Sequence, residues 1–121
     1  IVAFQKQLGT SVSIAGRTPK KVKTLASEFA CNIAVNGDSA FDLIINCTPV
    51  GMLGGDDPEG NPLEELAPWV TLNASMHVFD TVYCPERTPL IASASDLGCN
   101  TTTGVEMFKL QAKEQQQIWS Q

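Results

Sequence analysis

The sequence has no long apolar run and no excess of positive charge. None of its apolar stretches approaches the roughly 18 residues of a membrane-spanning helix, and its start, IVAFQKQLG, lacks the features of a signal peptide. Its 121 residues carry 8 Lys and Arg against 13 Asp and Glu, a net charge of −5. Because nucleic acids bind basic surfaces, this balance argues against a nucleic-acid partner. We therefore expect a cytoplasmic protein with neither a membrane nor a nucleic acid as partner.

Histidine and metal-binding cysteine patterns are also scarce. His77 is the single histidine, and the four cysteines form no C-x-x-C pair. We therefore predict no metal site, reduced cysteines and a structural His77. Cys31 and Cys47 follow a helix pattern and an apolar strand, where a small buried thiol packs well. The chain also begins without Met, and we interpret it as part of a longer protein.

What the sequence does contain is an alternation of short apolar strands and amphipathic helices. With 43% apolar and 17% charged residues, it has the composition of one folded domain, residues 1–121. The patterns predict strands at 12–15, 33–35, 42–46, 78–82 and 99–101, and helices at 19–30, 62–66, 88–97 and 104–119. Repeated strand–helix units predict an α/β fold with a mostly parallel sheet, a three-layer Rossmann-like domain. The 42–46 strand is apolar enough to be buried on both faces.

Two helix starts carry capping signals. Thr18 is a good N-cap before Pro19, which suits the first helical position. Thr103 and Glu106 have the spacing of a capping box, so the last helix should begin at Gly104.

One part of a dinucleotide fold is missing. Such a fold begins with a strand and a glycine-rich turn, and residues 1–8 look like the end of the helix that follows them. We therefore expect the first strand, the turn and the pyrophosphate site to lie before residue 1.

A basic cluster follows the 12–15 strand. In a dinucleotide fold this position meets the adenosine ribose, where an acid takes the 2′-hydroxyl of NAD and an Arg accommodates the 2′-phosphate of NADP. Here the strand is followed by Gly16, Arg17 and Thr18 with no acid, and Lys21 comes one turn later. The free N–H groups of the following helix add to an anion site. The cluster therefore predicts NADP as cofactor.

The stretch from Val78 to Gln111 combines a strand ending in Asp-x-x-Tyr with a final helix that starts at Gly104. In a parallel sheet, ligands bind beyond the carboxyl ends of the strands. This layout places the phenol of Tyr83 and the amide of Gln111 toward one cleft, as a small polyhydroxylated acid would require.

Four segments together resemble the C-terminal, NADP-binding half of the shikimate dehydrogenase family. They are GRTPKKVKTLA, DLIINCTPVGM, FDTVYCPERTPL and GVEMFKLQA, which occur in the family's order and at its spacing over nearly all of Ser11 to Trp119. The sequence GVEMF, at the start of the last predicted helix, also resembles that of bifunctional dehydratase–dehydrogenases.

The resemblance implies roles for the matching positions. The adenosine 2′-phosphate would be held by Gly16, Arg17, Thr18 and Lys21, and the cofactor groove would be lined by Thr48, Pro49 and Val50. Thr81 and Gly104 would approach the nicotinamide, and Met107 either packs against it or belongs to the core. Tyr83 and Gln111 would hydrogen-bond shikimate or 3-dehydroshikimate, although a Tyr at a strand end can also be structural.

The chain also departs from the family. Gly16 replaces the usual Asn, which leaves Arg17 as the main clamp on the phosphate. The family's catalytic Lys and Asp belong to an N-terminal substrate domain that is absent here, so we assign no catalytic residue and expect this chain to be inactive alone. The implied reaction of the whole enzyme is NADPH-dependent, reversible reduction of 3-dehydroshikimate. The alternatives are a quinate dehydrogenase and a non-catalytic, shikimate- or quinate-sensing regulatory relative.

Overall fold

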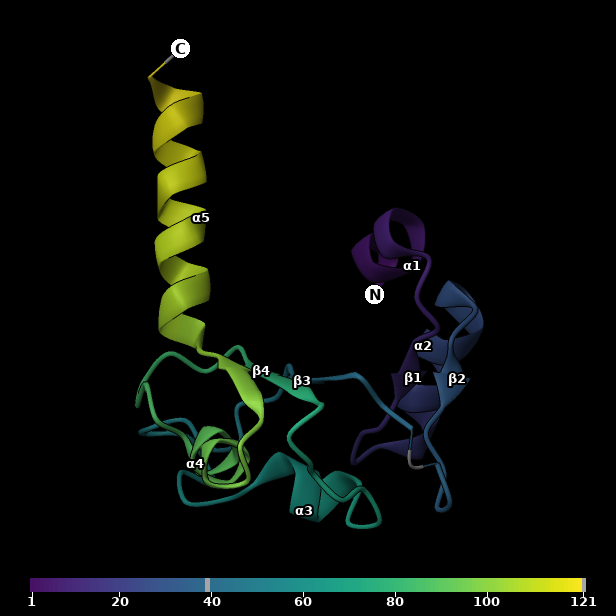
Figure 1. Ribbon diagram of the computed structural model, residues 1–121. Helices are drawn as coiled ribbons and strands as arrows, with labels where there is room; N and C mark the ends of the chain where they lie inside the picture. The colour runs from purple at the N-terminus through teal and green to yellow at the C-terminus, as the bar shows by residue number, and fades with distance from the viewer. Residues whose placement is uncertain (39, 121) are drawn as a thin grey trace.

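The computed structural model describes residues 1–38 and 40–120, which form alternating helices and strands (Figure 1). In chain order the elements are α1 (Val2–Leu8), β1 (Ser13–Ile14), α2 (Pro19–Phe29), β2 (Asn32–Ile33), β3 (Leu43–Asn46), α3 (Pro62–Leu66), β4 (His77–Asp80), α4 (Pro89–Asp96), β5 (Asn100–Thr102) and α5 (Gly104–Trp119). Each predicted helix and strand is present, with bounds that differ from the predicted ones by at most two residues.

All strand pairs are parallel, as the alternating pattern predicts. They form two sheets rather than one: β1 pairs with β2, while β3, β4 and β5 form a three-stranded sheet in that order. Figure 1 shows β1 and β3 as the edges by which the two sheets face each other, and no described strand lies between them. The strands therefore divide the described part of the chain into two sheets.

The helix starts depend on local capping. The capping box of α5 is confirmed: the Thr103 side chain accepts from the Glu106 N–H, and the Glu106 carboxylate accepts from the Thr103 N–H at 2.7 Å. Thr88 caps α4 by accepting from the Ile91 N–H. Thr18 is the N-cap residue of α2, as predicted, but its side chain makes no capping hydrogen bond.

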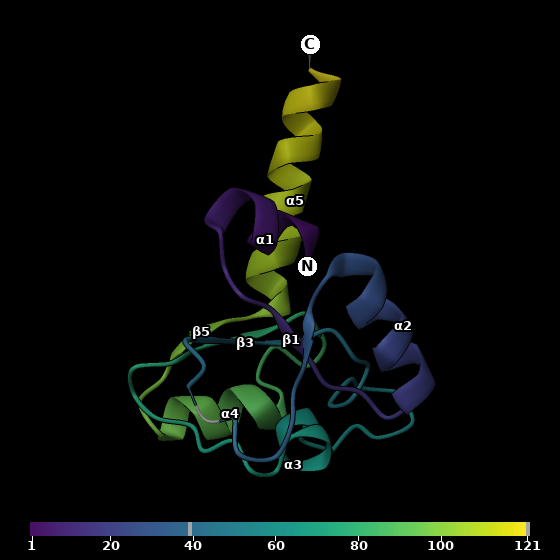
Figure 2. The same ribbon diagram turned by 90° about the vertical axis from the view of Figure 1, so that its right-hand side faces the viewer.

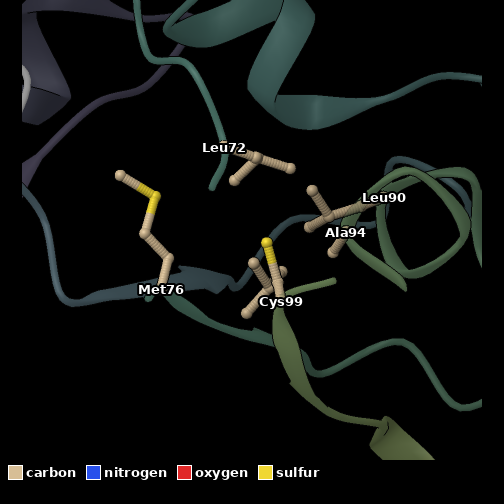
Figure 3. Packing of buried hydrophobic residues seen from close by; sticks show 6 residues of the cluster. Leu72, Met76, Leu90, Ala94 and Cys99 are labelled. Atoms are coloured by element: carbon tan, nitrogen blue, oxygen red, sulfur yellow. The ribbon is translucent and has the colours of Figure 1, made fainter. Parts of the chain in front are cut away.

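The main core lies between the three-stranded sheet and α4. Figure 3 shows the side chains of Leu72, Leu90, Ala94 and Cys99 converging, with Met76 alongside. Val78 of β4 belongs to the same cluster and has no exposed surface. This packing explains why α4, whose apolar residues recur along one face, covers β4 and β5.

The other side of the sheet is less covered. α3 and α4 lie on one side, whereas α1 and α5 rise from the opposite side and α5 extends away from the sheet (Figures 1 and 2). Gly104 is the buried residue of α5. The prediction that β3 is buried on both faces is therefore wrong for this structure, since Leu43 is 37% exposed and only Asn46 of the strand is buried. Within residues 1–38 and 40–120 no helix combines the length and the apolar character of a transmembrane segment.

Candidate functional site

Two strands end in polar residues that are buried and bonded to each other. Asn46 ends β3 and Asp80 ends β4, and the register pairs them. The Asp80 carboxylate has no exposed surface and accepts three hydrogen bonds, from Asn46 Nδ2 (2.9 Å), Val82 N (3.0 Å) and Thr88 Oγ1 (2.7 Å). A buried carboxylate is costly unless its oxygens are satisfied, and here each oxygen accepts at least one bond. Asp80 therefore joins the ends of β3 and β4 to the start of α4.

Asn46 arranges the loop that follows β3. Its Oδ1 accepts from both the N–H and the hydroxyl of Thr48, at 2.9 and 2.7 Å, and its Nδ2 donates to the Val50 carbonyl at 3.3 Å. Its carbonyl oxygen accepts from the N–H and hydroxyl of Thr81. The structure thus brings together three of the residues that the resemblance assigns to the cofactor groove: Thr48 and Thr81 are half-buried and Val50 is buried. Pro49, between them, is exposed.

The start of α5 packs directly on the backbone that follows β4. A Cβ atom on Gly104 would lie against the carbonyl groups of Val82 and Thr81, so any side chain there would displace the helix or the loop. This contact gives Gly104 a structural reason to be glycine, besides the nicotinamide proximity that the sequence predicts.

The predicted substrate residues lie at the same end. The Tyr83 ring stacks on Phe108 of α5, with centroids 6.2 Å apart and planes at 29°, and it remains 60% exposed. Gln111, three residues beyond Phe108, is exposed. Met107 is half-buried in the first turn of α5. The stacking places the phenol against the helix that carries the amide.

The basic cluster stands apart from these residues. The segment between β1 and the first turn of α2 exposes the four residues of the cluster, Gly16, Arg17, Thr18 and Lys21. Within the part of the chain that the structure describes, no hydrogen bond joins them to Asn46 or Asp80. A Cβ atom on Gly16 would meet only the Val22 side chain, at 3.0 Å. The structure thus places the predicted site residues in two groups.

Arg17 is paired with an acid that the sequence analysis did not assign. Its Nε and Nη2 donate to the two carboxylate oxygens of Glu65, at 2.5 and 2.9 Å. This hydrogen bond and the charge of Arg17 lower the pKa of Glu65, and the same contacts raise the pKa of Arg17. Asp57 and Asp56 add to the negative potential at Arg17. No acid follows β1 in the sequence, but the fold supplies one from α3.

His77, the single histidine, has a partner on the neighbouring strand. His77 Nε2 lies 2.7 Å from Thr102 Oγ1 across the β4–β5 pair. All four cysteines are free, and Cys99 is buried. Cys47, which follows β3, is exposed rather than buried as expected; partial desolvation still raises the pKa of its thiol. Among the described residues, no group of three or more His, Cys, Asp or Glu side chains is arranged to hold a metal ion.

Parallel strands followed by helices, with polar side chains gathered at the carboxyl ends of the strands, define the Rossmann-like class of α/β domains. Solved structures agree: a shikimate 5-dehydrogenase-like protein matches 93% of the chain with a TM-score of 0.75 at 27% identity. A shikimate dehydrogenase in complex with NADP+ matches 88% with a TM-score of 0.70 at 30% identity. The predicted fold class is confirmed.

Sequence comparison gives the family. A shikimate dehydrogenase (NADP(+)) of Maridesulfovibrio salexigens is 37% identical over 114 residues, which cover 90% of this chain and 39% of the relative. No protein-family model matches the chain. The chain spans about two fifths of the length of the curated relatives that it matches. It therefore belongs, by sequence and by fold, with the C-terminal part of the shikimate dehydrogenase family.

Proposed function

We propose that this chain is the NADP-binding part of a shikimate dehydrogenase that reversibly reduces 3-dehydroshikimate to shikimate. The observation that carries the cofactor assignment is Arg17, which is exposed between the carboxyl end of β1 and the N-cap of α2. Relatives named for NADP(+), and a similar structure in complex with NADP+, support the same cofactor. A cytoplasmic location is part of this proposal.

The donors around Arg17 fit a phosphate. A guanidinium matches the geometry of phosphate oxygens, and Thr18 leaves the first amides of α2 without a side-chain acceptor. Lys21, one turn into the helix, adds a positive charge. In the proposed complex, Gly16 lets the backbone approach the adenosine, and Arg17, Thr18 and Lys21 hold the 2′-phosphate.

The β3–β4 network would support the other end of the cofactor. Asn46 and Asp80 fix the loop that carries Thr48, Pro49 and Val50, so that the proposed groove has a defined wall. Thr81, Gly104 and Met107 would border the nicotinamide. When bound, NADPH supplies the hydride, and the residues of this chain bind and orient it.

We further propose that Tyr83 and Gln111 bind shikimate from one side. Both are exposed, and Tyr83 packs on Phe108, one turn before Gln111 on α5. In a longer parent protein, the segment that corresponds to the upstream part of the relatives would supply the substrate domain. We propose that residues before Ile1 also supply a parallel strand between β1 and β3, which face each other. On this view the chain alone binds cofactor weakly and does not catalyse hydride transfer.

A binding experiment tests the cofactor assignment. NADPH and NADH are titrated calorimetrically into the chain, into Arg17→Ala and into Lys23→Ala, a matched loss of one positive charge from α2. A charge-assisted bond to phosphate predicts that the chain prefers NADPH by about tenfold, and that Arg17→Ala but not Lys23→Ala loses this preference. Equal affinity of the unmodified chain for both dinucleotides would contradict the proposal. If the longer parent protein binds NADPH without reducing 3-dehydroshikimate, the non-catalytic relative is favoured instead.

A further inference from the structure

Arg17 already has an anionic partner within the chain. The two oxygens of Glu65 accept from Nε and Nη2, so the pair is bidentate. Glu65 lies on α3, 48 residues away in sequence, and Figure 2 shows the N-terminal end of α2 on the side of the molecule where α3 lies. The pair is a long-range product of the fold.

Glu65 occupies one edge of the guanidinium that a phosphate would use. Arg carries five N–H donors in a planar fork, and the edge formed by Nε and Nη2 is one of those that can donate two hydrogen bonds to one anion. With Glu65 on that edge, a phosphate either displaces the carboxylate or binds the remaining edge beside it. In the second case two anions share one cation, and the repulsion between them weakens binding.

The surroundings add to this effect. Asp56 and Asp57, in the loop that precedes α3, also lie close enough to act on Arg17. The side chains of Arg17 and Glu65 are 56% and 37% exposed, so the pair is accessible and its strength is modest. A partner of modest strength can be exchanged for a phosphate.

We infer that Glu65 is a specificity-determining residue that competes with the 2′-phosphate of NADP for Arg17. This inference rests on the proposed function, because it takes Arg17 as the phosphate ligand. The competition lowers affinity for ligands with a 2′-phosphate and leaves ligands without one unaffected. Glu65 therefore narrows the preference for NADP over NAD that Arg17 creates.

The test uses 2′,5′-ADP, which carries the 2′-phosphate, and 5′-ADP, which lacks it. Both are titrated into the unmodified chain, Glu65→Gln, Glu64→Gln and Arg17→Ala, at low ionic strength. Glu64 is the matched control, since it is the neighbouring acid on α3 and accepts from Asn61 instead of Arg17. We expect Glu65→Gln to bind 2′,5′-ADP about two- to fivefold more tightly, the range of an exposed ion pair, with 5′-ADP unchanged. Glu64→Gln should behave as the unmodified chain.

A second readout follows the pair itself. The Nε–H signal of Arg17 in nuclear magnetic resonance spectra should move on addition of 2′,5′-ADP and should already be displaced in Glu65→Gln. In a variant that combines Arg17→Ala with Glu65→Gln, the second change should have no effect on 2′,5′-ADP affinity.

The outcomes separate the two proposals. If the unmodified chain does not prefer 2′,5′-ADP over 5′-ADP, the proposed function fails, as it does when the chain binds NADPH and NADH equally. If the chain shows an Arg17-dependent preference but Glu65→Gln leaves it unchanged, the competition is refuted. Weaker binding by Glu65→Gln also refutes it, since Glu65 would then orient Arg17 for the phosphate.

Discussion

Replacing Asp80 by Asn tests the buried network beneath the proposed groove. The change keeps the volume of the side chain, so the effect comes from the hydrogen bonds. Oδ1 can still accept from Asn46 and Val82, but the Thr88 hydroxyl, now 2.7 Å from the other oxygen, would face an amide that donates. Thr88 would have to turn its proton away from its only described acceptor.

The magnitude follows from these three bonds. A hydrogen bond to a charged group contributes about 1.5–3 kcal/mol and a neutral one about 0.5–1.5 kcal/mol, so three weakened bonds amount to roughly 3 kcal/mol. Relief from burying a charge offsets part of this loss. We expect the free energy of unfolding to fall by about 1–3 kcal/mol. Folded domains have a free energy of unfolding of roughly 0.05–0.15 kcal/mol per residue, so a domain of this length should remain folded after the change.

The assay is urea unfolding followed by circular dichroism, with Asp96→Asn as control. Asp96 also accepts from a partner, Arg87 Nη2 at 3.1 Å, but both side chains are exposed, so its replacement should shift the midpoint much less. If Asp80→Asn unfolds at the same urea concentration as Asp96→Asn, the buried network does not stabilise the strand ends as described.

Two further predictions concern the start of α5 and the ion pair. Gly104→Ala places a methyl group against the Val82 carbonyl, and thermal denaturation should show that the free energy of unfolding falls by about 1–3 kcal/mol. The control is Gly16→Ala, whose methyl group meets only a side chain, and its free energy of unfolding should fall clearly less. Equal losses in the two variants would contradict the packing of Gly104 on the Val82 carbonyl. Because the folded pKa of Glu65 lies below its ordinary value of 4.5, the pair is present above that pH and is lost as pH falls through the lowered pKa. A carboxyl ¹³C titration should therefore give a lower midpoint for Glu65 in the unmodified chain than in Arg17→Ala, and coinciding midpoints would refute the pairing.

Local signals in the sequence predict the elements well and the contacts between them poorly. The capping box of Thr103 and Glu106 depends on residues three apart, and it forms as predicted. The parallel pairing follows from the alternation of strands and helices. Thr18 shows the limit of a local rule, since it stands at the N-cap without the expected hydrogen bond.

The contacts that the sequence did not predict join residues that are far apart in the chain. Asn46 and Asp80 are 34 positions apart, and only the register of β3 and β4 brings them together. For each of these two residues the sequence contains one signal, a polar residue at the end of an apolar strand. Glu65 had no such signal, because α3 has five residues and nothing in its sequence identifies Arg17 as a partner.

The division into two sheets has a consequence for cooperativity. Among the hydrogen bonds within residues 1–38 and 40–120, those between Arg17 and Glu65 are the ones that connect the β1–β2 part to the β3–β4–β5 part. Val22 and Ala26 are the buried residues of α2, whereas the other part holds the main core. Amide protons of the first part should therefore exchange with solvent sooner. A ligand that draws Arg17 away from Glu65 would also uncouple the two parts unless it contacts both.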